Sequence, residues 1–157
     1  MPHTHIQIRV PFADVDKSGR IHFTAMLRYM DIAEHELVRT LGFPRATTFP
    51  DTEFPRVHVS CDYRRAICYD DELTMEARIA HVGRSSWTAA FTAYYTHELK
   101  ELGSLASKSV AAGQLTIVAI DKKTERATPL PDALRAALVA DLKETTEADN
   151  HEADSHS

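Results

Sequence analysis

The residues of this chain best suited to chemistry lie in one short segment, Phe12–Phe23. The segment holds two carboxylates, Asp14 and Asp16, followed by Gly19 and His22. A carboxylate serves as a general base, a nucleophile, a metal ligand or a turn former that accepts backbone N–H bonds. A stretch of helical periodicity follows directly. We therefore expect these groups beside the N-terminus of a helix.

Two noncatalytic interpretations of this segment are also possible, a calcium-binding loop and a simple turn. Asp14, Asp16 and Gly19 match the first positions of an EF-hand calcium loop, but Ala25 stands where the bidentate glutamate is required. In the second reading the two carboxylates only shape a turn. Elsewhere, His35-Glu36 lacks the second histidine of a zinc helix. We predict no metal ligands in this chain.

A long helix is the element that must position these groups. Gly42 and Pro44 mark its end, and the hydroxyl of Thr24 is expected to cap its start. The helix is indicated by apolar residues that recur at intervals of three and four and so form one stripe. These residues are Phe23, Met26, Leu27, Met30, Ala33, Leu37 and Leu41.

Strands are expected before and after this helix. Ile6, Ile8 and Val10 alternate with polar residues, and four later segments are rich in β-branched and aromatic residues. Their short connections favour antiparallel pairing, which predicts an α+β fold with the helix packed on an antiparallel sheet. The four segments are 57–65, 72–81, 86–97 and 108–120.

A second helix is predicted from Pro131, with leucines at four-residue spacing up to Leu142. The acidic stretch 143–157 has too little apolar content to fold, so we expect it to be disordered. With 157 residues, 43% of them hydrophobic, the chain fits a single domain over residues 1–142.

Charge and cysteine content exclude several classes of protein. Apart from the acidic end, the chain is nearly neutral and shows no basic stripe, which argues against nucleic-acid binding. Met1–Phe12 has no signal-peptide pattern, and no apolar run is long enough to span a membrane. Cys61 and Cys68, on one extended segment, stand too far apart to bridge. We expect a reduced, cytoplasmic protein.

Several motifs resemble those of the hotdog-fold acyl-CoA thioesterases of the 4-hydroxybenzoyl-CoA thioesterase type. The run from Asp14 to Glu34 is similar to the family pattern D-x-D-x-x-G-x-[IV] and the helix that follows it. Residues 61–73 resemble D-Y-x-x-P-x-x-x-x-D-x-L, with Ala66 in place of the proline. Residues 83–86 resemble the G-[RK]-[ST]-S turn, and Leu130-Pro131 the closing L-P. The resemblance covers about residues 5 to 142.

This resemblance implies a hotdog fold, an antiparallel sheet wrapped around one long central helix. It implies a homodimer or homotetramer with active sites between copies, and no cofactor. The implied reaction is hydrolysis of an acyl-CoA, aromatic or of short to medium chain, to the free acid and coenzyme A. By the motif, Asp16 is the base or nucleophile, and the backbone N–H of Phe23 or Thr24 stabilises the oxyanion. Glu34 is the alternative acid, since some hotdog thioesterases carry theirs on the helix.

Further residues complete the expected site. His22 is a candidate for orienting the thioester or water. Met26, Met30 and Phe54 are candidates for lining an acyl pocket, and Arg84 for binding the phosphates of coenzyme A. Two other functions remain open: release of an acyl chain from an acyl carrier protein, and a noncatalytic domain that binds acyl-CoA.

Overall fold

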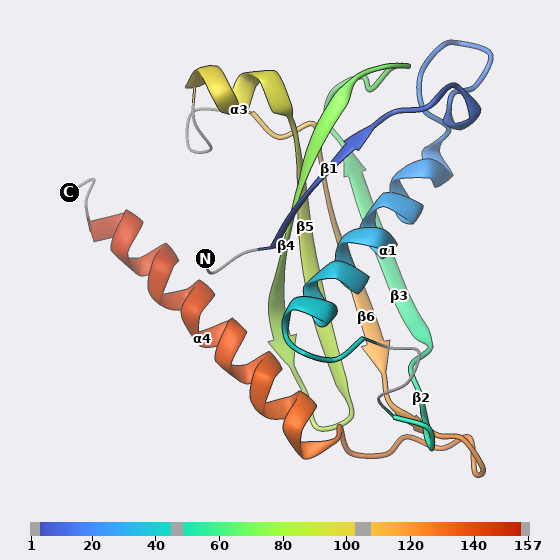
Figure 1. The fold of residues 1–157 in the computed structure, drawn as a ribbon, viewed down its shortest axis with the longest axis vertical. Helices are drawn as coiled ribbons and strands as arrows, with labels where there is room; N and C mark the ends of the chain where they lie inside the picture. Colours follow the sequence, from blue (N-terminus) through green and yellow to red (C-terminus); the bar gives the residue numbers. More distant parts are fainter. Residues whose placement is uncertain (1–3, 45–48, 103–107, 155–157) are drawn as a thin grey trace.

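The computed structural model describes residues 4–44, 49–102 and 108–154. In these ranges a five-stranded antiparallel sheet has the order β1-β4-β5-β6-β3, and α1 (Phe23–Thr40) lies along one of its faces (Figure 1). A two-stranded ribbon of β2 and β7 stands near one end of the sheet. The strands are β1 (Thr4–Arg9), β2 (Thr52–Glu53), β3 (Arg56–Tyr63), β4 (Glu72–Val82), β5 (Ser86–Tyr95), β6 (Ala111–Val118) and β7 (Ile120–Asp121).

The predicted stripe matches the buried face of α1 in part: Met26, Met30, Ala33 and Leu37 are buried. Leu27 and Leu41 are partly buried, and Phe23 is 66% exposed. Residues three and four apart share one side of a helix, so the stripe turns toward the sheet and joins its apolar face in one core. The buried residues of α1 are Ala25, Met26, Tyr29, Met30, Ala33, Glu34, Leu37 and Val38. Glu34 is the one carboxyl group in this set, and a buried carboxyl group needs a partner for its charge.

The two edges of the sheet differ in what covers them. Among the described residues, which begin at Thr4, the pairing of β1 with β4 extends to Ala77, and no described strand pairs with the rest of β4 on that side. α4 (Asp132–Asp154) packs there instead, and the carboxylate of Asp141 accepts the backbone N–H of Ile79 at 3.2 Å. On the opposite edge, β3 presents its side chains largely to solvent.

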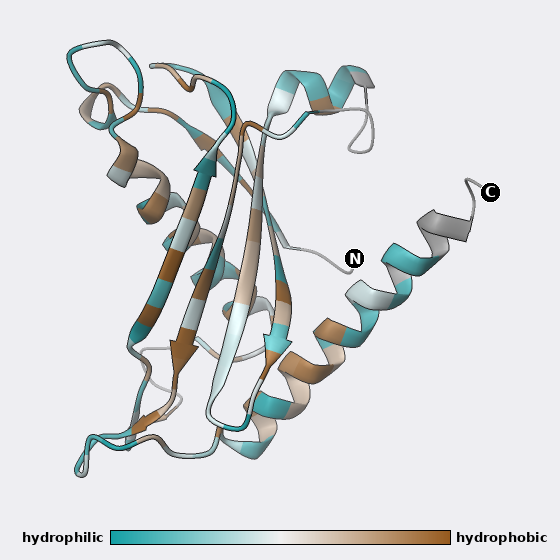
Figure 2. Ribbon diagram, turned by 180° about the vertical axis from the view of Figure 1, so that it is seen from behind, coloured by the Kyte–Doolittle hydropathy of each residue, from teal (hydrophilic) through white to brown (hydrophobic). Residues whose placement is uncertain are grey.

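The last helix is longer than expected. Disorder was predicted from Lys143 onward, whereas α4 continues to Asp154. Thr145 is buried, so this turn still packs against the body; its hydroxyl donates at 3.0 Å to the carbonyl of Asp141, one turn earlier in the same helix. Figure 2 shows the apolar bands of α4 gathered in its first part. The predicted segment ends in residues 155–157, which lie outside the described ranges.

Smaller differences concern the ends of elements. A short helix, α3 (Thr96–Leu102), occupies a segment that we expected to be strand and turn. A single turn of 3-10 helix, η1 (Phe12–Asp14), precedes the loop with the two carboxylates. No helix in the described ranges is both long and apolar enough to cross a membrane.

Candidate active site

The loop before α1 is built on a tight turn. The backbone N–H of Gly19 donates to the carbonyl of Asp16 at 3.0 Å, and the N–H of Asp16 donates to the carbonyl of Arg20 at 2.8 Å. Gly19 has φ of 85°, a left-handed conformation that side chains disfavour, which explains the glycine here. A bridge between Val15 and Ile21 closes the base of the loop. The turn therefore holds Asp16 at the tip of a small hairpin.

Asp14 anchors this loop to the helix. Its buried carboxylate accepts bonds from Arg28 and from the hydroxyl of Tyr29, the latter at 2.7 Å. The bond from Tyr29, followed by the bond and charge of Arg28, lowers the pKa of Asp14 below its usual value. The carbonyl of Asp14 also accepts the N–H of His22 at 2.8 Å. With both carboxylate oxygens engaged, Asp14 fits a structural role.

Asp16 has a different environment, because its side chain is exposed. One carboxylate oxygen accepts the backbone N–H of Ser18 at 2.7 Å and the Ser18 hydroxyl at 2.5 Å. The Ser18 hydroxyl, followed by the Ser18 N–H, lowers the pKa of Asp16. The second oxygen accepts no bond from a described residue. Asp16 therefore holds one ionised oxygen ready for a ligand.

At the start of α1 the two expected oxyanion donors, the N–H groups of Phe23 and Thr24, differ in their hydrogen bonding. Thr24 was predicted as the cap, but the ring Nδ1 of His22 fills this role and accepts the N–H of Thr24 at 3.3 Å. The N–H of Phe23 has no acceptor among the described residues. A ring nitrogen within reach of the first turn thus replaces the threonine hydroxyl. Phe23 retains a free amide at the positive end of the helix dipole, the better oxyanion donor.

His22 and Tyr63 frame this amide. The His22 ring stacks on the ring of Phe23, with centroids 4.7 Å apart. The hydroxyl of Tyr63, from the end of β3, donates to the carbonyl of Phe23. Tyr63 was not among the expected site residues. Its place in the D-Y motif was the available signal, but only the pairing of the strands brings it to the helix start.

A narrow apolar gap, with no room for a water molecule, lies under the first turns of α1. Met26 and Met30, both predicted to line an acyl pocket, border it. Phe54 does not border it, since its ring packs instead on Phe49 and Trp87, with centroids 5.9 and 5.6 Å away. The remaining lining residues are Cys61, Met75, Phe91, Ala93, Ala111, Ala112 and Gly113.

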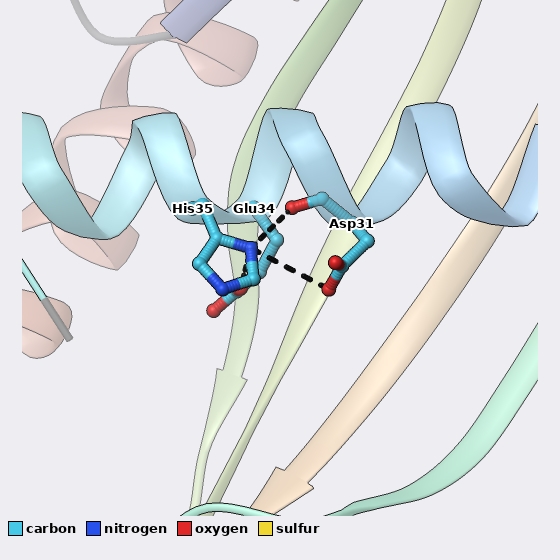
Figure 3. Close-up of side chains that lie close together, drawn as sticks. All are labelled: Asp31, Glu34 and His35. Atoms are coloured by element: carbon cyan, nitrogen blue, oxygen red, sulfur yellow. Dashed lines mark hydrogen bonds and ion pairs between the residues drawn. The ribbon is translucent and has the colours of Figure 1, made fainter. Parts of the chain in front are cut away.

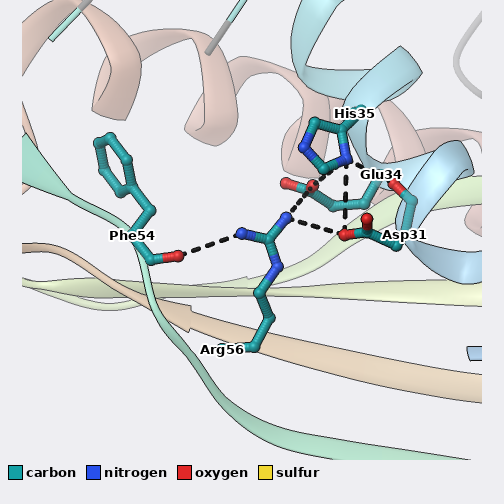
Figure 4. Close-up of polar contacts among 5 residues, drawn as sticks. All are labelled: Asp31, Glu34, His35, Phe54 and Arg56. Carbon is teal, nitrogen blue, oxygen red and sulfur yellow. Dashed lines mark hydrogen bonds and ion pairs between the residues drawn. The ribbon is translucent and has the colours of Figure 1, made fainter. Parts of the chain in front are cut away.

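The alternative acid, Glu34, belongs to a separate cluster in the middle of α1. Figure 3 shows it beside Asp31 and His35, whose Nδ1 lies 3.5 Å from an Asp31 carboxylate oxygen and 3.7 Å from one of Glu34. Arg56 of β3 reaches across to both carboxylates at 3.0 Å (Figure 4). Asp31, Glu34 and His35 have the spacing of metal ligands, but the guanidinium of Arg56 occupies the place of a cation.

Arg84 lies at the other end of the sheet from the loop. The loop meets the start of β4, where Arg20 bridges to Cys68, whereas Arg84 follows the end of that strand. An eleven-residue strand spans about 33 Å. Within one chain the structure therefore does not bring Arg84 to Asp16. Beside the loop, Arg20, Arg64 and Arg65 line a groove of about 290 Å³ with Ile21, Tyr63, Ala66 and Ile67.

Comparison with known proteins identifies this class of molecule. A solved 1,4-dihydroxy-2-naphthoyl-CoA thioesterase from Synechocystis superposes with a TM-score of 0.75 at 18% identity, covering 87% of this chain and 96% of that one. A gentisyl-coenzyme A thioesterase superposes with a TM-score of 0.73 at 21% identity, covering 86% and 99%. The hotdog fold predicted from the motifs is thereby confirmed.

The family model described as Thioesterase superfamily matches residues 18–98. The chain belongs to this superfamily. In sequence it is also similar to a 1,4-dihydroxy-2-naphthoyl-CoA hydrolase of Synechococcus sp. strain WH7803, with 28% identity over 143 residues, or 85% of this chain and 87% of that relative. The prediction of a thioester hydrolase from the loop and helix motifs is confirmed at the level of the family.

Proposed function

We propose that this protein hydrolyses acyl-CoA thioesters, with Asp16 and the Phe23 N–H as its reacting centre. The observation that carries this proposal is their pairing at one end of α1: a carboxylate with a free oxygen and an amide without an acceptor. His22, between them in sequence, stands near enough to Asp16 to lower its pKa. The thioesterases named above supply independent support for an acyl-CoA substrate.

The lowered pKa of Asp16 favours direct attack over general-base catalysis. A general base works best when its pKa lies near the working pH, whereas the bonds from Ser18 lower the pKa of Asp16, away from neutrality. In direct attack the free oxygen of Asp16 bonds to the thioester carbonyl carbon, whose oxygen takes the charge and faces the Phe23 N–H. The C–S bond then breaks, the thiolate leaves with a proton from water, and a second water hydrolyses the mixed anhydride.

Thiol release from a panel of acyl-CoAs tests the function. Aromatic and short to medium acyl groups are offered to the purified protein, and at least one should turn over with the wild type. The Asp16→Asn variant should show little release from the same substrates. If every substrate stays intact, the chain is better described as a noncatalytic domain that binds acyl-CoA.

The open edge of the sheet supports a second copy as partner. Val57, Val59 and Tyr63 of β3 are 58, 45 and 44% exposed, and Ile32 of α1 is 53% exposed. An unpaired edge strand with apolar side chains favours addition of another strand. We propose a homodimer or a homotetramer built on β3. Sedimentation of an active species at the mass of one chain, 17.6 kDa, would contradict this.

We place the protein in the cytoplasm. Cys61 and Cys68 both carry free thiols, as expected of a reducing compartment. Acyl release from a carrier protein remains the second candidate function, because the loop and the Phe23 amide would act on either thioester.

A further inference from the structure

The residue that offers the free amide is poorly anchored by its own side chain. Phe23 is 66% exposed, and its ring stacks on that of His22, which is exposed as well. Phe23 is also the first residue of α1, and helix ends fray because their terminal groups lack part of the helical bonding. The direction of its N–H therefore depends on hydrogen bonds from neighbouring elements.

Hydrogen bonds from two elements hold the backbone on either side of this amide. From the loop, the carbonyl of Asp14 accepts the N–H of His22 at 2.8 Å. From the sheet, the hydroxyl of Tyr63 donates to the carbonyl of Phe23. The Phe23 N–H belongs to the peptide group between these two, whose carbonyl accepts the N–H of Ala25 at 2.9 Å. Three consecutive peptide groups are thus fixed, and the middle one carries the free N–H.

Tyr63 is a well-supported donor for this purpose. It is the last residue of β3 and pairs with Ala111 of β6, and the next N–H, that of Arg64, donates to the carbonyl of Val110 at 2.9 Å. Figure 1 shows the end of β3 and the start of α1 at the same end of the molecule. Partial burial, followed by the charge and bond of Cys61, raises the pKa of Tyr63 to about 12. Its hydroxyl therefore remains a protonated donor at neutral pH.

We propose, on the basis of the thioesterase function above, that Tyr63 is a positioning residue for the oxyanion donor. Its hydroxyl holds the first turn of α1 against β3, so that the N–H of Phe23 faces the place where negative charge develops on the thioester oxygen. A donor fixed in advance stabilises that charge without having to move during the reaction. Because the charge develops only in the transition state, loss of the hydroxyl lowers kcat and leaves substrate binding unchanged.

Tyr63→Phe removes the hydroxyl and keeps the ring. Thiol release should show kcat lowered about tenfold, less than the 10²–10³-fold loss for deletion of a donor, because the Phe23 N–H is displaced and not removed. KM should stay within about twofold of the wild type. Tyr95→Phe is the matched control, since the Tyr95 hydroxyl also donates to a backbone carbonyl, that of Ala66 outside α1. The control should leave kcat unchanged. Equal losses in both variants, or a raised KM in Tyr63→Phe, would overturn the proposal.

The amide itself can be observed by NMR without any turnover. In Tyr63→Phe the Phe23 N–H signal should shift, and its order parameter should fall from about 0.85, typical of rigid backbone, toward about 0.6. Tyr95→Phe should leave both unchanged. A wild type that releases no thiol would contradict the proposed function. By contrast, an unchanged Phe23 amide in an active Tyr63→Phe variant would overturn only the role of Tyr63.

Discussion

The chain offers two acids to a thioester, Asp16 in the loop before α1 and Glu34 within the helix, and their surroundings differ. Asp16 is exposed, keeps one oxygen free of described donors, and shares the helix start with the unbonded N–H of Phe23. Glu34 has no exposed surface and lies 3.0 Å from the guanidinium of Arg56. A buried carboxylate stays ionised only when a cation or hydrogen-bond donors offset the cost of burying its charge. Its oxygens are then occupied by those partners and are not available to a substrate.

Glu34 also lies too far along α1 from the Phe23 N–H to act on a carbonyl held there. Eleven residues separate Phe23 from Glu34, which at the rise of an α-helix is about 16 Å. Within one chain they therefore belong to different centres. The comparison indicates that an available charge, rather than the presence of a carboxylate, distinguishes a reacting group from a structural one. Four predictions challenge this distinction.

The largest effect is expected for Asp16→Asn. An amide of nearly the same shape replaces the carboxylate, so kcat should fall about a hundredfold or more, the scale of a lost base or nucleophile. Because the side chain is exposed, the melting temperature should change little. Steady-state thiol release and thermal melts on the same preparation measure both. Near-normal turnover by a folded variant would remove Asp16 from the mechanism.

Glu34→Gln should affect stability instead of chemistry. It leaves Arg56 without its buried partner, but Arg56 is itself 29% exposed, so the cost should be about 1–2 kcal/mol, less than for a fully buried pair. Turnover per folded molecule should stay within about threefold of the wild type. Asp31→Asn, which removes the half-exposed partner of the same arginine, is the control and should cost less. A large loss of kcat in Glu34→Gln would reverse the comparison.

Asp14→Asn provides a test within the loop itself. Asp14 resembles Glu34 in being buried and bonded, so its loss should cost about 1 kcal/mol of stability. The folded-state pKa of Asp14 is lowered, so its stabilisation is complete above the unfolded pKa of about 3.9 and is lost as pH falls through the folded value. Urea unfolding between pH 3 and 7 should therefore show a shallower acid slope in the variant. Equal slopes would mean that Asp14 is not held by Tyr29 and Arg28.

The smallest effect concerns the pH profile of the wild type. Since the pKa of Asp16 is lowered, kcat/KM should change less than about twofold on the acid side between pH 7 and pH 5. A limb with a midpoint near pH 6 that disappears in a variant of His22 would assign it to that ring. A limb that persists in His22 variants would show that the assembled site raises the pKa of Asp16, which favours a general base.

The sequence predicted those features that depend on short-range pattern. The three- and four-residue spacing from Met26 to Leu37 defines the buried face of α1, and alternation defines the main strands. The cap could not be predicted in this way, because a histidine ring at His22 competes with the hydroxyl that statistics favour at Thr24. The end of α4 depends on the burial of Thr145 against the body, which composition does not reveal.

The candidate site was predictable where the motif is local and not where it is assembled across strands. Asp16, His22 and Phe23 are close in the chain, and the structure keeps them together. Arg84 was chosen from its motif, yet strand length places it at the far end of the sheet from Arg20. Tyr63 reaches the start of α1 only through the pairing of β3 with β6, and register of that kind follows from the whole sheet.

The rate at which Cys61 is labelled can report whether an acyl group is bound under α1. Cys61 borders the narrow apolar gap under α1, and burial raises the pKa of its thiol, so alkylating reagents should modify it slowly. Cys68, exposed on the same chain, serves as a fast reference. An acyl group that displaced the side chains around this gap and bound among them would shield Cys61 and leave the labelling of Cys68 unchanged. The ratio of the two labels would then measure occupancy of the pocket without a chromophore or a turnover assay.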